Sequence, residues 1–162
     1  MSAAQELIPI DVAAASIVAA IAKVRRSGTI RHILVTRTDG LSIAHDLPDA
    51  TQAKRVAAMA AAIIGTGEMA TNTLEIGRLR EATVDADAGQ VVCLRAGAHA
   101  IVAGMTKGDA NVGLVLMVLR ELAQVVEQTL GDRTPHGNEV PGLGTNPNDL
   151  SPQSPESLRR LL

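Results

Sequence analysis

The sequence predicts an α/β fold with an antiparallel sheet, and three observations support this prediction. Apolar runs at Ile33–Val35 and Leu41–Ala44 flank the pair Asp39-Gly40, and both turn residues tolerate the positive φ that a tight hairpin needs. Helical periodicity lies on both sides of this hairpin. Residues 79–105 then have the pattern of three strands separated by turn residues, so the expected order is α-β-β-α-β-β-β-α.

The composition is typical of a globular protein with one domain and an extension. The chain has 162 residues, of which 46% are hydrophobic, and a formal net charge of −2. These values argue against a disordered chain and against a nucleic-acid-binding protein. No uninterrupted apolar run approaches the roughly 20 residues of a membrane span, and the first residues lack the pattern of a signal peptide. Cys93 is the single cysteine, so no internal disulfide can form and we expect a cytoplasmic protein.

The chain contains no Phe, Tyr or Trp. Aromatic rings provide the stacking platforms for single-stranded nucleic acids and the cages for quaternary ammonium ligands, so neither binding mode is open to this protein. The core must be built from aliphatic side chains and many alanines, which bury less area per residue than aromatic side chains do. A domain of this kind gains from a second subunit.

The first helix is expected to begin at Asp11, a favourable N-cap residue. Ile17, Ile21 and Val24 follow at i, i+4 and i+7, so one stripe of the helix faces a core. Basic residues crowd the last turn, where cations complement the helix dipole, and Gly28 can end the helix. A phosphate-binding patch is the alternative interpretation of these basic residues, which are Lys23, Arg25 and Arg26.

The second helix is expected over Thr51–Leu74, with an aspartate of the segment Asp46–Asp49 as its cap. Two apolar stripes run along it, one formed by Val56, Met59, Ile63, Ala70 and Leu74 and the other by Ala57, Ala61 and Ile64. The alanine-rich stripe permits the close approach of another backbone. Gly65 and Gly67 would each cost about 1 kcal/mol inside a helix, so the alternative is a helix that ends near Ile64.

Three strands follow the second helix. Leu79–Asp85 mixes charged and apolar side chains, as expected of an edge strand. After a turn at Asp87–Gly89, Gln90–Ala96 has the pattern of the next strand. Ala98–Met105 is apolar on both faces apart from His99, which predicts a central strand covered by helices above and below.

The third helix is expected to begin at Asp109 or Asn111 and to end at Gly131. Leu114–Leu119 is continuously apolar, so we expect this helix to be the most deeply buried element outside the sheet. The side chains at helical spacing on its core face are Val115, Leu119, Leu122 and Val126.

The composition changes after Gly131. Most of the chain's seven prolines fall in residues 132–162, interleaved with Gly, Asn, Asp and Ser, so we expect a domain over 1–131 and a mostly flexible extension. Near its end, Ser154-Pro155 is a helix-start signal. This short segment either docks into a groove of the protein or a partner, or frays. Its apolar side is formed by Leu158, Leu161 and Leu162, with Arg159 and Arg160 opposite.

The order of elements, the hairpin motif VTRTDGLSIA (Val35–Ala44) and the helix start DANVGLV (Asp109–Val115) together resemble the roadblock / dynein light chain family. The resemblance spans roughly Asp11–Leu130. It implies a profilin-like three-layer sandwich. In such a sandwich a five-stranded antiparallel sheet carries the second helix on one face and the first and third helices on the other.

The same resemblance implies a non-catalytic regulator or scaffold that binds a Ras-like small GTPase and uses no cofactor. Family members form homodimers by pairing the second helix with its mate and by joining edge strands into one continuous sheet. As partners we therefore expect a second copy of this chain and a GTPase, and neither nucleic acid nor a membrane. The residues of this chain at the dimer positions are Ala57, Ala61, Ile64, Arg80, Glu81, Ala82, Thr83 and Val84.

No catalytic or metal-binding constellation is visible in the sequence. The chain has no G-x-x-x-x-G-K-[ST] motif, so it is not itself a P-loop GTPase. Cys93 lies in an expected strand, where it is a small buried hydrophobe rather than a nucleophile. The alternatives are a sensor that holds a small ligand between sheet and helix, and an enzyme that uses Cys93 or a histidine. The four histidines are scattered without metal-ligand spacing, at His32, His45, His99 and His136.

Overall fold

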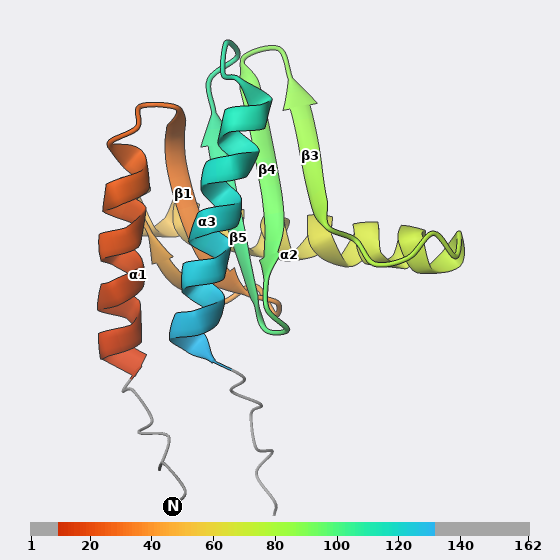
Figure 1. Cartoon of the computed structure of the whole chain (residues 1–162), viewed down its shortest axis with the longest axis horizontal. Helices are drawn as coiled ribbons and strands as arrows, with labels where there is room; N and C mark the ends of the chain where they lie inside the picture. Colours follow the sequence, from red (N-terminus) through yellow and green to blue (C-terminus); the bar gives the residue numbers. More distant parts are fainter. Residues whose placement is uncertain (1–9, 132–162) are drawn as a thin grey trace, which may run out of the picture.

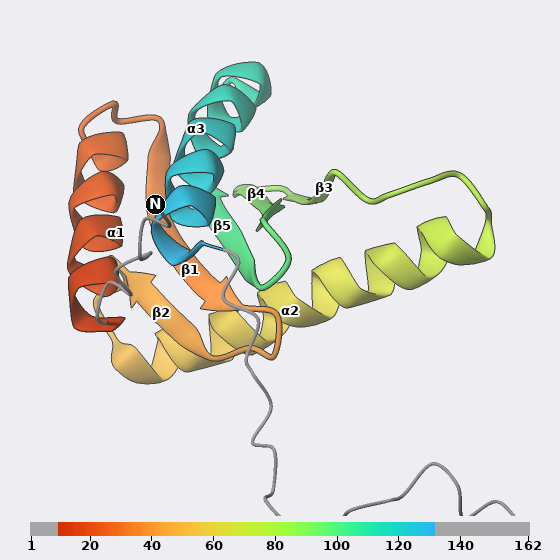
Figure 2. The ribbon, with the colours of Figure 1, turned by 60° about the horizontal axis from the view of Figure 1, so that its bottom comes forward.

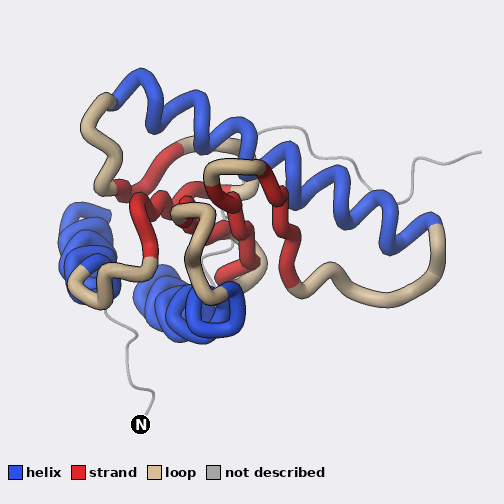
Figure 3. The backbone as a smooth tube through the Cα atoms, turned by 90° about the horizontal axis from the view of Figure 1, so that it is seen from above, coloured by secondary structure: helices blue, strands red, loops and turns tan. Residues whose placement is uncertain are grey.

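The computed structural model describes residues 10–131, which form a three-layer sandwich (Figure 3). One helix covers one face of a five-stranded sheet and two helices cover the other, as expected. The expected order of elements is confirmed. In chain order the elements are α1 (Ile10–Arg25), β1 (Ile30–Arg37), β2 (Ser42–His45), α2 (Ala50–Thr73), β3 (Glu81–Ala86), β4 (Gly89–Ala96), β5 (Ala100–Thr106) and α3 (Val112–Leu130).

The sheet has the strand order β2-β1-β5-β4-β3, and all neighbouring strands are antiparallel (Figure 1). The last strand in the chain, β5, is therefore central, as its apolar pattern on both faces predicts. The charged strand β3 lies at an edge, which is also confirmed. It begins at Glu81 rather than Leu79, and the Leu79 side chain lies against Gly67 of α2.

The turn between β1 and β2 is built on Asp39 and Gly40. Gly40 has a φ of +85°, whereas Asp39 contributes its carboxylate, which accepts a hydrogen bond from the Leu41 amide at 3.1 Å. A Cβ atom at position 40 would lie 3.3 Å from the backbone Cα of Ala58 in α2. Glycine is therefore required here both for the turn and for the close approach of the hairpin to α2.

Two apolar layers hold the sandwich together. Because side chains alternate along a strand, Ile33 and Val35 face α1 and α3, whereas Leu34 faces α2. The layer under α2 takes mostly alanines from the helix, so α2 lies close to the sheet. The buried side chains of that layer are Leu34, Leu47, Ala53, Ala57, Ala60, Ile64, Cys93, Ile101 and Ala103.

The helix ends follow the expected capping chemistry. The Asp49 carboxylate accepts hydrogen bonds from the amides of Thr51 and Gln52 at the start of α2. Asn111 caps α3 by accepting a bond from the Leu114 amide at 3.2 Å. Helix α1 starts one residue before the predicted Asp11. Helix α2 runs unbroken to Thr73, so the alternative of a shorter second helix is wrong.

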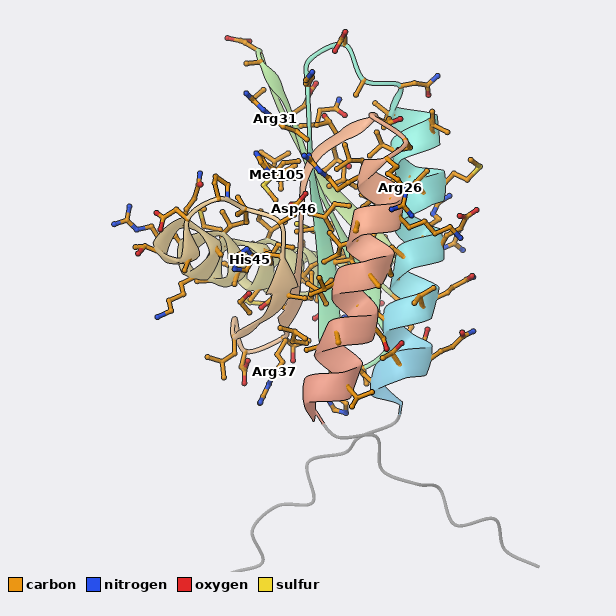
Figure 4. All side chains as sticks on the ribbon, turned by 90° about the vertical axis from the view of Figure 1, so that its left-hand side faces the viewer. Arg26, Arg31, Arg37, His45, Asp46 and Met105 are labelled. Carbon is orange, nitrogen blue, oxygen red and sulfur yellow. The ribbon has the colours of Figure 1, made fainter. Side chains whose placement is uncertain are left out.

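Asp46 fastens the hairpin to α1 instead of capping α2. Its Oδ1 accepts a hydrogen bond from the Ile33 amide at 2.7 Å, and its Oδ2 lies 2.6 Å from Nε of Arg25 (Figure 4). Arg25 also donates to the Ile30 carbonyl at 3.1 Å. The basic end of α1 is thus partly used to hold β1 and β2.

Helix α3 is less enclosed than its sequence predicts. Its core-facing residues Val115, Leu119, Leu122 and Val126 are buried, but Leu114 and Met117 are 42% and 51% exposed. None of the helices in residues 10–131 is long and apolar enough to cross a membrane. The expected extension over 132–162, including its short amphipathic segment, lies outside the described residues.

Candidate functional site

Helix α2 is longer than the sheet it crosses. Its 24 residues span about 36 Å at 1.5 Å per residue, whereas five strands spaced about 4.8 Å apart span roughly 19 Å between the outer strand axes. The last of its buried residues is Ile64. The end of α2 and the loop that follows it project past β3 (Figures 1 and 2). We call residues 69–76 the overhang.

The overhang is rich in exposed apolar side chains. Met69 is 71% exposed, Leu74 is 66% exposed and Ile76 is 70% exposed. Single exposed apolar residues are ordinary, but a group of them on one projecting element indicates an interaction surface.

An apolar groove runs along α2 on the side where the helix leaves part of the sheet uncovered. It has a volume of about 210 Å³. Met59 at its helical wall is 55% exposed, and Val84 at its strand wall is 46% exposed. All of its lining residues are apolar, namely Val56, Met59, Ala60 and Ile63 of α2 and Val84, Val91 and Met105 of the sheet.

A more polar cavity of about 430 Å³ continues from this groove toward the start of α2. It shares Val84, Val91 and Met105 with the groove and adds Arg31 and His32 at the start of β1. Arg31 and Met105 are labelled in Figure 4. Among the described residues, His32 Nδ1 and Gln90 Oε1 are buried without a hydrogen-bond partner. The nearest acidic oxygen to His32 Nδ1 is Asp46 Oδ1 at 3.7 Å, which is too long for a hydrogen bond. The cavity therefore offers polar groups that a further binding partner could satisfy.

The edge strand β3 completes the exposed surface. Its six residues pair with β4 on one side, from Glu81 opposite Leu94 to Ala86 opposite Gly89. Within residues 10–131 no strand pairs with its other side. An unpaired strand edge presents backbone donors and acceptors that another chain can use.

The residues expected at a dimer interface fall into two groups in the structure. Arg80, Thr83 and Val84 are exposed, and Glu81 and Ala82 are half-buried along β3. In α2, by contrast, Ala57 and Ile64 are buried against the chain's own sheet, and Ala61 is half-buried. The alanine-rich stripe thus serves the internal core, where its small side chains let α2 lie close to the sheet.

The groove is lined by the other stripe of α2. Val56, Met59 and Ile63 form its helical wall, and Leu74 continues the same stripe into the overhang. The sequence contained this signal, since the five residues of the stripe recur at helical spacing. It did not show which of two apolar stripes would meet the sheet.

An ion pair fastens α2 where the overhang begins. Arg95 of β4 donates from Nε to Oε1 of Glu68 and from Nη1 to the Ala98 carbonyl at 3.0 Å. The hydrogen bond from Arg95 lowers the pKa of the Glu68 carboxyl below its usual value, against a smaller opposing effect of burial. The same bond raises the pKa of the Arg95 guanidinium. The pair thus links α2 to β4 at the start of the overhang.

Neither an accessible cysteine nor a metal-ligand cluster occurs in the described part of the chain. Cys93 is fully buried in β4, and burial raises the pKa of its thiol to about 11, so it has little thiolate at neutral pH. This placement confirms the expected buried cysteine. Residues 10–131 contain no group of three or more His, Cys, Asp or Glu side chains that could hold a metal ion.

Comparison with known proteins agrees with the family resemblance of the sequence. The family profile described as Roadblock/LC7 domain matches residues 14–103. Uncharacterized protein MJ1340 of Methanocaldococcus jannaschii is 29% identical over 98 residues, which are 60% of this chain and 85% of that protein. Uncharacterized protein MJ0714 of the same organism is 26% identical over 105 residues, which are 65% of this chain and 88% of that protein.

Solved structures share the fold at low sequence identity. The Roadblock/LC7 domain from Streptomyces avermitilis superposes with a TM-score of 0.67 and 18% identity, covering 70% of this chain and 96% of that one. The gliding protein MglB from Thermus thermophilus superposes with a TM-score of 0.66 and 16% identity, covering 73% and 90%. The profile match extends over more than half of the chain and includes the hairpin, α2 and the edge strand. The chain belongs to the Roadblock/LC7 domain family.

Proposed function

We propose that this protein is a non-catalytic homodimeric regulator or scaffold that binds a Ras-like small GTPase in the cytoplasm and modulates or localises it. The observation that carries the dimer is the continuous apolar stripe of α2, which lines the groove at Met59 and Ile63 and reaches the overhang at Leu74. A groove and an overhang on one helix are the two complementary halves of a symmetric interface.

The geometry favours a two-fold axis at the open edge of β3. If β3 pairs antiparallel with β3 of a second copy, each overhang passes over the partner's sheet. The first three strands of that sheet lie within about 15 Å of the edge at roughly 4.8 Å per strand. The overhang then comes to lie beside the partner's α2, above the strands that α2 leaves uncovered. Its apolar side chains fill the groove at Val84, Val91 and Met105.

The polar cavity fits the end of the partner's helix. A helix C-terminus carries a partial negative charge, and Glu75 follows α2 directly. Arg31 and His32 line the cavity that the overhang approaches in this arrangement. The carbonyls at the helix end and the Glu75 carboxylate accept hydrogen bonds, so in this arrangement the donor that they meet in the cavity is the Arg31 guanidinium.

The proposed interface therefore combines two surfaces. From β3 it uses Arg80, Glu81, Ala82, Thr83 and Val84. From α2 it uses Val56, Met59 and Ile63 in place of the buried Ala57 and Ile64, with Ala61 at its margin. A structural neighbour described as MglB with tetrameric arrangement, with a TM-score of 0.67 and 17% identity, supports assembly as a property of proteins with this fold.

The GTPase part of the proposal comes from family membership. Its test uses the purified full chain and a Ras-like small GTPase from the same genome, loaded with GDP or with a non-hydrolysable GTP analogue. We expect light scattering to give the mass of a dimer at micromolar concentration and calorimetry to show nucleotide-dependent binding of the GTPase. A single-protomer mass contradicts the dimer. A dimer that neither binds the GTPase nor changes its hydrolysis or exchange contradicts the regulatory function alone.

A small-ligand sensor is the second candidate, and the cavity of about 430 Å³ beside His32 and Gln90 is the observation that favours it. In the proposed dimer the partner's overhang occupies the same space. A ligand of this cavity would therefore raise the melting temperature and at the same time shift the protein toward single protomers. A ligand that stabilises the intact dimer would place the ligand site elsewhere.

A further inference from the structure

The outer surface of α1 and α3 exposes several apolar side chains among polar ones. Between Val12 and Ala22, Ser16 is the only polar residue of α1, and a helix that is apolar all round is normally buried. Yet Val12 is 51% exposed, and the outer side of α3 adds Leu114, Met117 and Val125 at 42%, 51% and 40%. This surface lies on the opposite side of the sheet from the groove and β3 edge face proposed for the dimer (Figure 3).

Two ion pairs orient the helices α1 and α3 on the sheet. Arg120 donates to Glu81 of β3 at 2.7 Å, so that flank of α3 faces β3. At 100° per residue, Leu114, Val118 and Val125 lie on the opposite flank, toward α1. The Arg25–Asp46 pair turns the Arg25 flank of α1 toward the end of β2. At 100° per residue, Val12 and Ala19 lie away from that flank, on a stripe that also carries Ser16 and Lys23. We call the resulting surface the α1–α3 seam, formed by Val12, Ala19, Leu114, Met117, Val118 and Val125.

We propose that the segment Ser154–Leu162 of the same chain docks on the α1–α3 seam as one amphipathic helical turn. Leu158, Leu161 and Leu162 recur at i, i+3 and i+4 and so fall on one side of such a turn. Ala19 contributes a small, exposed side chain on the α1 side of the seam. An amphipathic turn in an apolar groove between helices is a common recognition mode.

The chain can reach the seam from where it leaves the sandwich. Helix α3 ends at Leu130, at the same end of the helical layer as the start of α1 (Figure 1). Residues 132–154 allow a reach of up to about 75 Å at roughly 3.3 Å per residue. The 19 residues of α3 extend only about 28 Å. Tethering at this range gives a high effective concentration, which compensates for a small contact area.

Charge selects this segment over the other part of the chain outside the described residues. Glu121 is exposed, lies four residues from both Met117 and Val125, and forms no ion pair within residues 10–131. At 100° per residue Arg159 flanks the leucine side of the segment and complements this carboxylate, whereas Arg160 lies opposite the leucines and adds positive charge at longer range. Residues 1–9 contain Glu6 and no Lys or Arg, so they would place a like charge near Glu121.

In this proposal the segment Ser154–Leu162 covers the α1–α3 seam of its own chain. A partner that binds Ser154–Leu162 would uncover the seam, and a partner that binds the seam would release the segment. This covering is independent of the dimer, since it uses the opposite side of the sheet.

Disulfide trapping in the full chain tests the docking. Met117→Cys with Leu161→Cys is compared with Lys54→Cys with Leu161→Cys, in which Lys54 is an exposed residue of α2 on the opposite face. Native Cys93 is fully buried and does not compete. We expect the Met117 pair to form an intrachain disulfide at least ten times faster than the Lys54 pair. Equal rates overturn the proposal. So does a disulfide that forms only between chains when the single-cysteine proteins Met117→Cys and Leu161→Cys are mixed.

Charge reversal gives a second measurement that does not depend on packing. Glu121→Lys in the Met117/Leu161 cysteine pair should slow disulfide formation severalfold, and adding Arg159→Glu with Arg160→Glu should restore the rate.

Hydrogen exchange provides an independent readout on the chain without added cysteines. Leu158→Asp with Leu161→Asp should raise amide exchange in residues 12–22 and 114–125. Unchanged exchange there, or no restoration by the paired reversal, overturns the assignment of Ser154–Leu162 as the occupant.

Discussion

Arg95 of β4 and Glu68 of α2 form a hydrogen-bonded ion pair at the point where α2 leaves the sheet. The two residues are far apart in the chain, and their side chains are about 31% and 30% exposed. Arg95 is itself held by the Ala98 carbonyl, so the pair is anchored to the turn between β4 and β5. This contact ties α2 to β4 one residue before the overhang begins.

Glu68→Gln should destabilise the protein by about 0.5–1 kcal/mol at pH 7, since partly exposed ion pairs contribute on that order. The pKa of Glu68 is lowered in the folded state, so its contribution is present above the unfolded value of about 4.5 and is lost as pH falls through the lower folded pKa. The difference between wild type and Glu68→Gln in urea unfolding should therefore shrink as the pH is lowered below about 4.5. Asp87→Asn, at an exposed turn, is the control, and a loss that does not depend on pH would contradict the role of the charge.

Two glycines of α2 should respond to alanine in opposite directions. At Gly65 an added Cβ meets no atom within 4 Å, so Gly65→Ala should stabilise the helix by up to about 1 kcal/mol. At Gly67 the Cβ would lie 2.8 Å from Cδ2 of Leu79, and Gly67→Ala should destabilise by about 1 kcal/mol because Leu79 must move. The melting temperatures of the two variants, measured by thermal unfolding, test both predictions.

The contact with Leu79 is itself testable by a double-mutant cycle. If Leu79 is the cause, Gly67→Ala should cost less in a Leu79→Ala background than in the wild type. Equal costs in the two backgrounds would mean that the strain at Gly67 has another origin.

The sequence predicts those features of the fold that depend on local pattern. The Asp39-Gly40 turn, the edge position of β3 and the central position of β5 follow from turn chemistry, charge and apolar residues on both faces. The caps at Asp49 and Asn111 also follow, because side-chain acceptors at helix starts act over two or three residues.

The orientation of α2 could not be predicted because both of its stripes are apolar. The alanine stripe meets the sheet because Ala57 and Ile64 pack against strand residues such as Leu34 and Ile101, which are far from them in the chain. The length of the overhang depends in turn on the width of the sheet, which no single segment encodes. For the same reason the continuous run at Leu114–Leu119 does not reveal that Leu114 and Met117 remain exposed.

Cys93 should be unreactive in the native protein. Its full burial and a pKa raised to about 11 leave neither access nor thiolate at pH 8. We expect an aromatic disulfide reagent to label one thiol per chain in urea and none in the folded protein over the same time. Cys93→Ala should retain any GTPase binding while losing some stability from the smaller side chain. Rapid labelling of the folded protein, or loss of binding in Cys93→Ala alone, would revive a reactive-cysteine role.

Met59→Glu should convert the proposed dimer to single protomers. Met59 is 55% exposed at the wall of the groove, so a charge there is tolerated in one protomer but is desolvated when the partner's overhang covers it. Ala62→Glu makes the same charge change three residues along α2, on the outward side of the helix, and should leave the dimer intact. Light scattering across a concentration series measures the dissociation constant of both variants, with circular dichroism as a check on folding. A dimer that tolerates Met59→Glu as well as Ala62→Glu would exclude the groove from the interface. In that case pairing would have to rest on the edge of β3 alone, which Val84→Pro would then disrupt.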